Sequence, residues 1–94
     1  PAYLFYLAEA MQQGAEACGL EPEDADTIIR QTLLGAATLL SVDGRPAYDL
    51  RKAVTSRGGT TQAATEMLDV RAVMGAIRDA VVAARDRARE LAEG

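Results

Sequence analysis

Apolar side chains recur every three or four residues along most of this chain, which is the spacing of helices that bury one face. No segment shows the strict alternation of a half-buried strand. The pattern therefore predicts an all-α fold, a helical bundle of about five helices, over residues 1–18, 22–40, 48–54, 60–68 and 72–92.

Turn and capping residues punctuate these helices. Gly19 follows the first helix as a left-handed cap, and Pro22 stands at the first position of the second, ahead of acidic residues that favour the positive end of the helix dipole. The turn-rich segment 41–47 predicts a connection, and 55–59 a loop.

The first helix is apolar on more than one face, since Tyr3, Leu4, Phe5, Tyr6 and Leu7 follow one another directly. A helix that is apolar on most sides is buried on most sides. In so short a chain, that burial requires a partner subunit. The last helix instead has one apolar face and one mixed-charge face, which we interpret as solvated.

Composition narrows the function. The 94 residues predict one domain, 1–94, and the net charge of -4 argues against general binding of nucleic acid or of a membrane surface.

The chain has no histidine, which removes the commonest general base and metal ligand, and its only cysteine, Cys18, is predicted to be a small buried residue. No acidic spacing fits a metal loop, so we expect no metal site. With neither a signal peptide nor a spanning apolar run, we expect a cytoplasmic protein.

One segment, Ser56-Arg57-Gly58-Gly59-Thr60-Thr61, has the residues for binding chemistry. Paired glycines before a helix let the backbone approach a ligand, and the helix start offers unpaired N–H groups, so the segment suits a carboxylate or phosphate. A loop with an ordinary N-cap also fits, with Gly59 or Thr60 as the cap and Gln62 completing a capping box. The local pattern alone favours this second interpretation, because short glycine motifs are weak evidence.

The same loop resembles pyrroline-5-carboxylate reductase, whose signature is a leucine-anchored short helix followed by Val-Thr-Ser-Pro-Gly-Gly-Thr-Thr. Here the residues run from Leu50 to Thr61 as Leu-Arg-Lys-Ala-Val-Thr-Ser-Arg-Gly-Gly-Thr-Thr. The resemblance covers the whole chain, from Pro1-Ala2-Tyr3 to the closing Arg87-Ala88-Arg89-Glu90-Leu91. The ordered set of matches is specific, although each one alone is weak.

The resemblance implies a C-terminal dimerisation domain of an enzyme that reduces the imino acid 1-pyrroline-5-carboxylate to L-proline with NADPH or NADH. The nucleotide belongs to an N-terminal Rossmann domain that lies outside this chain, so the domain alone is expected to be inactive and to bind no cofactor. Two copies interleave into a homodimer, which some members assemble into rings. Ser56, Arg57, Gly58, Gly59, Thr60 and Thr61 are the implied substrate-binding residues: Ser56, Gly59 and Thr60 hold the carboxylate, and Thr61, the implied catalytic residue, hydrogen-bonds the ring nitrogen.

Two departures from the family pattern leave alternatives open. Arg57 stands where the family has proline, and its charge could strengthen carboxylate binding, point to solvent, or mark an enzyme for another cyclic imino acid or a diacid. Arg71-Ala72 stands where the family usually has two glycines, which predicts a shorter break between the last two helices. A dimerisation module of a reductase paralogue without catalysis is a further alternative.

Overall fold

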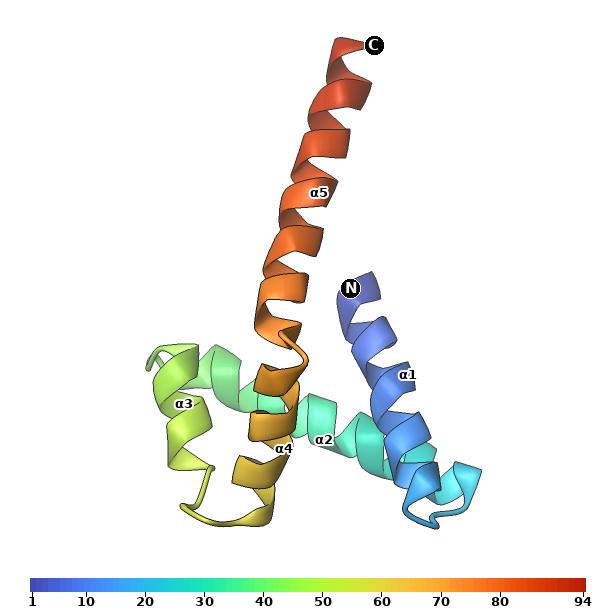
Figure 1. Ribbon diagram of the computed structural model, residues 1–94, viewed down its shortest axis with the longest axis vertical. Helices are drawn as coiled ribbons and strands as arrows, with labels where there is room; N and C mark the ends of the chain where they lie inside the picture. Colours follow the sequence, from blue (N-terminus) through green and yellow to red (C-terminus); the bar gives the residue numbers. More distant parts are fainter. The chain divides into compact units, whose positions relative to one another are not determined.

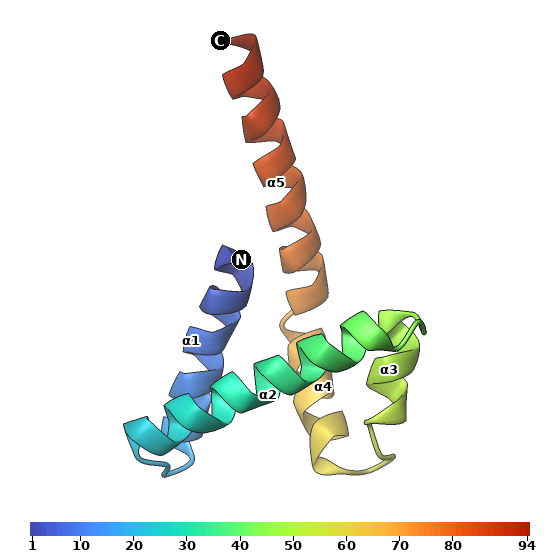
Figure 2. The same ribbon diagram turned by 180° about the vertical axis from the view of Figure 1, so that it is seen from behind.

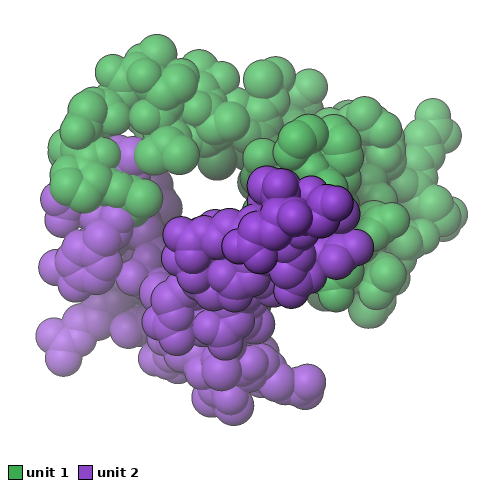
Figure 3. All heavy atoms as spheres, turned by 90° about the horizontal axis from the view of Figure 1, so that it is seen from above, with its two compact units in different colours: residues 1–47 green, residues 48–94 purple.

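The computed structural model describes residues 1–94, and it contains five α-helices and no strand (Figures 1 and 2). The helices are α1 (Ala2–Ala17), α2 (Pro22–Val42), α3 (Ala47–Ala53), α4 (Thr60–Val70) and α5 (Val73–Glu93). The predicted all-α fold with five helices is confirmed. Contacts divide the chain into two compact units, Pro1–Ala47 and Tyr48–Gly94 (Figure 3), which are described one at a time.

In the first unit, a glycine-dependent turn joins α1 to α2. Gly19 has a φ of 101°, and its N–H donates to the Glu16 carbonyl at 2.9 Å, while the Leu20 N–H donates to the Ala15 carbonyl at 3.2 Å. These two bonds form a Schellman motif, which satisfies carbonyls at the end of a helix. The left-handed cap that the sequence predicted is therefore confirmed.

Small and branched side chains form the core of this unit, where α1 packs against α2. Ala25 and Ile29, one turn apart on α2, are both buried. Beside them, the Gln12 side chain of α1 donates a hydrogen bond of 2.8 Å to Asp26, which also pairs with Arg30 at 2.9 Å. The polar pairs lie at the edge of the contact and fix how α1 and α2 meet.

Helix α2 ends at Val42, two residues beyond the predicted end, because Asp43 closes it. The Asp43 N–H donates to the Leu39 carbonyl at 2.9 Å, and the Asp43 carboxylate accepts from the Arg45 backbone N–H and side chain. The hydrogen bonds from Arg45 hold the pKa of the Asp43 carboxyl below its usual value. This side-chain turn starts the predicted connection to α3.

In the second unit, α4 and α5 are separated by only two residues, Arg71 and Ala72. Figure 1 shows α5 continuing beyond α4 after this short break. Ala72 has a φ of 54°, a left-handed conformation that favours glycine. The break at Arg71-Ala72 therefore spans two residues, and an alanine adopts a glycine-like backbone within it.

The chain buries few of its own apolar side chains. Only Ala25, Ile29 and Leu50 are buried, whereas twenty large hydrophobic residues are exposed, including Tyr6 at 76% and Phe5 at 67%. The exposed set lies on all five helices. Cys18 is also exposed, so its predicted burial is wrong in the single chain. It is the C-cap residue of α1, at the end of the helix and outside the core.

Replacing Ala72 by glycine tests the strain in this break. A positive φ costs a non-glycine residue about 1–2 kcal/mol, and the greater freedom of unfolded glycine offsets about 0.4–1 kcal/mol of that. We expect Ala72→Gly to raise the free energy of unfolding by up to about 1 kcal/mol. The control is Ala76→Gly inside α5, which should lower it by about 1 kcal/mol. Urea unfolding at one fixed protein concentration makes the comparison, and equal losses in both variants would show that Ala72 is unstrained.

Candidate functional site

The segment before α4 forms a tight turn over Ser56–Gly59. The Gly59 N–H donates to the Ser56 carbonyl at 3.0 Å, and Gly58, the third residue of the turn, has a φ of 75°. A turn with positive φ at its third residue requires glycine there and favours proline at its second, the place of Arg57. A Cβ on Gly59 would lie 3.2 Å from the Ser56 carbonyl oxygen. The backbone therefore requires glycine at position 58, whereas a Cβ at Gly59 would be tight and would need Ser56 to shift by a few tenths of an ångström.

Gln62 ties this turn to the first turn of α4. Its side-chain oxygen accepts a hydrogen bond from the Gly58 N–H, one residue before the N-cap Gly59. A capping box would return to the cap residue instead. The capping box considered for this segment is therefore wrong in its partner, although Gln62 does fold back onto the loop.

The start of α4 leaves backbone donors without acceptors. Gly59 has no side chain to cap the helix, and the N–H groups of Thr60, Thr61 and Gln62 donate to no group in the chain. Such groups carry the positive end of the helix dipole. The other helix starts for which a cap is defined also lack side-chain cap bonds, so missing caps alone do not single out this site.

Side-chain hydroxyls do single it out. The chain has nine serine and threonine residues, and six donate to a backbone carbonyl three or four residues earlier, at 2.6–3.1 Å. The three whose hydroxyls form no hydrogen bond within the chain are Ser56, Thr60 and Thr61, all of them exposed. The structure therefore brings the predicted hydroxyls together with three free N–H groups at one helix start.

Arg57 is the one charged residue of the predicted site. It is exposed and belongs to no ion pair, in contrast to Arg30, Arg45, Arg78, Arg85 and Arg87. The site as a whole therefore presents donors and positive charge, with no carboxylate of its own.

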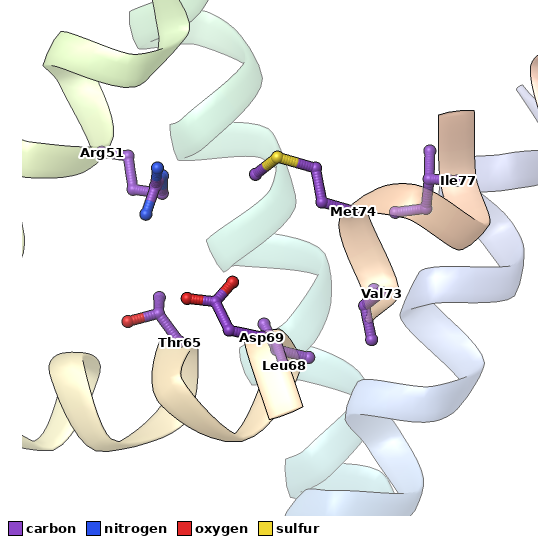
Figure 4. A pocket seen from close by; sticks show the side chains of 7 residues that line it. All are labelled: Arg51, Thr65, Leu68, Asp69, Val73, Met74 and Ile77. Atoms are coloured by element: carbon purple, nitrogen blue, oxygen red, sulfur yellow. The ribbon is translucent and has the colours of Figure 1, made fainter. Parts of the chain in front are cut away.

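A separate pocket, which the sequence did not predict, lies elsewhere in the second unit (Figure 4). It has a volume of about 220 Å³ and is lined by Arg51 of α3, by Thr65, Leu68 and Asp69 of α4, and by Val73, Met74 and Ile77 of α5. In Figure 4 the side chains of Arg51 and Asp69 point into its open space. The spacing of four residues within α4 and within α5 is the only sign of it in the sequence. None of the predicted site residues lines this pocket.

No three His, Cys, Asp or Glu side chains gather where they could hold a metal ion. None of the helices is both long enough and apolar enough to cross a membrane.

The fold defines an all-helical domain whose packing is incomplete within one chain, and comparison with known proteins gives its family. A family model described as pyrroline-5-carboxylate reductase dimerisation matches residues 1–91. The chain is 43% identical to the pyrroline-5-carboxylate reductases of Arabidopsis thaliana, over 93 residues, and of Pseudomonas aeruginosa, over 94 residues. It therefore belongs to the pyrroline-5-carboxylate reductase dimerisation family, as the sequence predicted. These matches cover 99% of this chain and 34% of each relative, so the chain spans about a third of their length.

Solved structures agree with this assignment. A pyrroline-5-carboxylate reductase from Coxiella burnetii superposes with a TM-score of 0.90 at 41% identity, covering 97% of this chain and 34% of that one. A Plasmodium falciparum pyrroline carboxylate reductase, solved with NADP bound, gives a TM-score of 0.84 at 24% identity, covering 88% of this chain and 33% of that one. The second likeness shows the shared fold.

The left-handed turn predicts a difference between two loop glycines. Gly58→Ala should lower the free energy of unfolding by up to about 1 kcal/mol, because a φ of 75° costs alanine about 1–2 kcal/mol and the smaller freedom of the unfolded chain offsets about 0.4–1 kcal/mol of that. Gly44→Ala is the matched control, since Gly44 has no positive φ and no atom within 4 Å of an added Cβ. Gly44→Ala should leave stability unchanged or raise it slightly. Denaturant unfolding separates the two, and equal stability of both variants would contradict the turn geometry.

Proposed function

We propose that this chain is the dimerisation and substrate-carboxylate-binding domain of a pyrroline-5-carboxylate reductase. The reaction is the NAD(P)H-dependent reduction of 1-pyrroline-5-carboxylate to L-proline, a step of proline biosynthesis. Family membership supports the reaction. The observation that carries the site is the cluster of three free hydroxyls and three free N–H groups at the start of α4.

The carboxylate of the substrate is held at this helix start. Backbone N–H groups and the dipole of α4 favour an anion there, and the hydroxyls of Ser56 and Thr60 donate to its oxygens. Gly59 allows close approach, because it carries no Cβ between the turn and the ligand. Binding through fixed donors holds the imine in one orientation, which is the main contribution that a protein makes to hydride transfer.

Thr61 is the residue that we assign to the ring nitrogen. Its hydroxyl is exposed and forms no hydrogen bond within the chain. A hydroxyl can accept a hydrogen bond from a protonated nitrogen and donate to an unprotonated one. Thr61 therefore stabilises the nitrogen in both protonation states as the adjacent carbon is reduced.

We assign no nucleotide site to the residues of this chain. All its regular structure is helical, and it has no glycine-rich loop between a strand and a helix, which a dinucleotide fold requires. We assign the nicotinamide cofactor, which supplies the hydride, to an N-terminal Rossmann domain outside these residues. The Plasmodium falciparum reductase was solved with NADP bound, and this chain covers 33% of that one. The isolated domain is expected to be inactive.

A second copy of the chain is the partner that covers the exposed apolar residues. The family model is described by dimerisation, and twenty exposed large hydrophobics far exceed the three buried side chains. Interleaving of two such helical domains would bury these residues without a further protein. We therefore propose a homodimer, and its assembly into larger rings requires further apolar surface that stays exposed after pairing.

Turnover by Thr61→Ala tests the site. In the full-length reductase, we expect kcat for 1-pyrroline-5-carboxylate to fall at least about tenfold, because the ring nitrogen loses its partner. Thr65→Ala is the control: it removes a hydroxyl from the same helix, but one that already donates to the Gln62 carbonyl at 3.0 Å. NADPH oxidation measures both variants. Unchanged turnover in Thr61→Ala would discard the site, and no turnover by a folded, cofactor-binding wild type would indicate a paralogue with another substrate or none.

Charge placed on the apolar face of α5 tests the homodimer. Ile77, exposed at 53% in the single chain, should become buried, so Ile77→Asp should weaken dimerisation at least about 100-fold. Arg78→Asp adds the same side chain one residue away, on the charged face, and should leave the dimer intact. Sedimentation of the full-length protein over a range of concentrations gives the dissociation constant of the dimer for each variant. A dimer that tolerates Ile77→Asp would place the interface elsewhere.

A further inference from the structure

The segment that contains the candidate site differs in charge from the rest of the chain. Residues 50–65 include Arg51, Lys52 and Arg57 but no Asp or Glu, so the segment carries three positive charges in a chain of net charge -4. Lys52 is the only lysine of the chain. An anion that approaches this acidic protein therefore meets a local positive region at the loop.

Of these three cations, Arg57 alone has no partner. Arg51 and Lys52 both lie over the Tyr48 ring, at 5.4 Å and 5.3 Å from its centroid, and they occupy the last turn of α3, where cations favour the helix dipole. Arg57 is exposed and forms no ion pair, hydrogen bond or cation–π contact. Its charge therefore has no structural role within the chain.

We propose that Arg57 recruits the anionic substrate to this loop by long-range electrostatic attraction. The inference rests on the proposed function. Arg57 is two residues from Gly59, so their Cα atoms lie at most about 7 Å apart. Both residues therefore belong to one short turn, and at about 0.01 M salt, where the Debye length is about 30 Å, the Arg57 charge acts on a carboxylate at the helix start.

Arg57 acts through its charge rather than as a geometric clamp. A bidentate clamp on a second carboxylate needs a guanidinium that neighbouring groups hold in place. No side chain holds the Arg57 guanidinium, and the residue lies in an exposed turn. The attraction should therefore lower KM for a substrate with a single carboxylate, and it should weaken as salt is added.

Steady-state kinetics of the full-length enzyme at several salt concentrations tests this role. For Arg57→Gln, kcat/KM for 1-pyrroline-5-carboxylate should fall about three- to tenfold at about 0.01 M salt, mainly through KM, and approach the wild-type value at about 0.5 M. Arg57→Lys should retain most of the effect. Arg57→Pro suits the turn and removes the same charge, so it should behave as Arg57→Gln does.

Arg71 offers a matched control for these measurements. It is also exposed and unpaired, but it stands at the other end of α4, about 16 Å along the helix from the loop. Arg71→Gln should lower kcat/KM clearly less than Arg57→Gln does at about 0.01 M salt, where the Debye length is about 30 Å, and should leave it unchanged at about 0.15 M, where the intervening distance is about two Debye lengths. An equal loss in Arg71→Gln would show that net charge, not Arg57, attracts the substrate, and would overturn the proposal.

Other outcomes would also overturn it. A salt-independent loss, or different effects of Gln and Pro, would assign Arg57 to the shape of the turn. A change in KM for NADPH alone would place it at the cofactor, and preference for a cyclic imine with two carboxylates, lost in Arg57→Gln, would make it a clamp. If wild type is active and Thr61→Ala is impaired but Arg57→Gln is normal, only this inference fails. If wild type is inactive, the proposed function fails with it.

Discussion

The constraint on which this structure depends is the burial of apolar surface that one chain cannot cover. Ala25, Ile29 and Leu50 are the only buried side chains, while α1 and α5 expose apolar residues along their lengths. Hydrophobic burial is the main force that offsets the loss of chain entropy on folding. A fold with so small a core therefore depends on self-association, in which the exposed apolar faces of its helices are buried against a partner chain.

Burial of apolar surface by a partner would also affect the candidate site, because helix α4 contributes to both. The loop stands at the N-terminal end of that helix, and Thr65, Leu68 and Asp69, farther along it, line the pocket that opens toward Met74 (Figure 4). A partner surface that fills the apolar part of the pocket would also fix the direction of α4. The donors at the helix start would then be held in place, because the N–H groups and hydroxyls move with the helix that carries them.

The sequence predicted the fold well because its strongest signals are local. Helical periodicity, Gly19 and Pro22 each act over a few residues, and the structure shows the expected helices and caps. The errors arose where side chains decide the outcome. Asp43 closes α2 two residues beyond the predicted end, and the Gln62 side chain accepts from the Gly58 N–H rather than from the cap residue. The pocket was not predicted, since its residues come from three helices and only the fold brings them together. Residue types and spacing proposed the anion site, and the family resemblance supplied the substrate.

The choice of residues at the start of α4 favours ligand binding over simple capping. A helix that needs only a cap places Ser, Thr, Asp or Asn at the N-cap, where the side chain occupies one of the free N–H groups. Here glycine holds that position, and hydroxyls stand on either side of it, at Ser56, Thr60 and Thr61. Residues in a first helical turn lack a preceding turn to bond, which explains the free threonine hydroxyls in part. The position in the first turn does not explain the free hydroxyl of Ser56, which lies outside the helix. Nor does it explain why no side chain of the loop accepts a hydrogen bond from the free N–H groups. Open helix starts also occur at α1, α2 and α5, so the free Ser56 hydroxyl beside a glycine N-cap is the feature that fits the proposed carboxylate site.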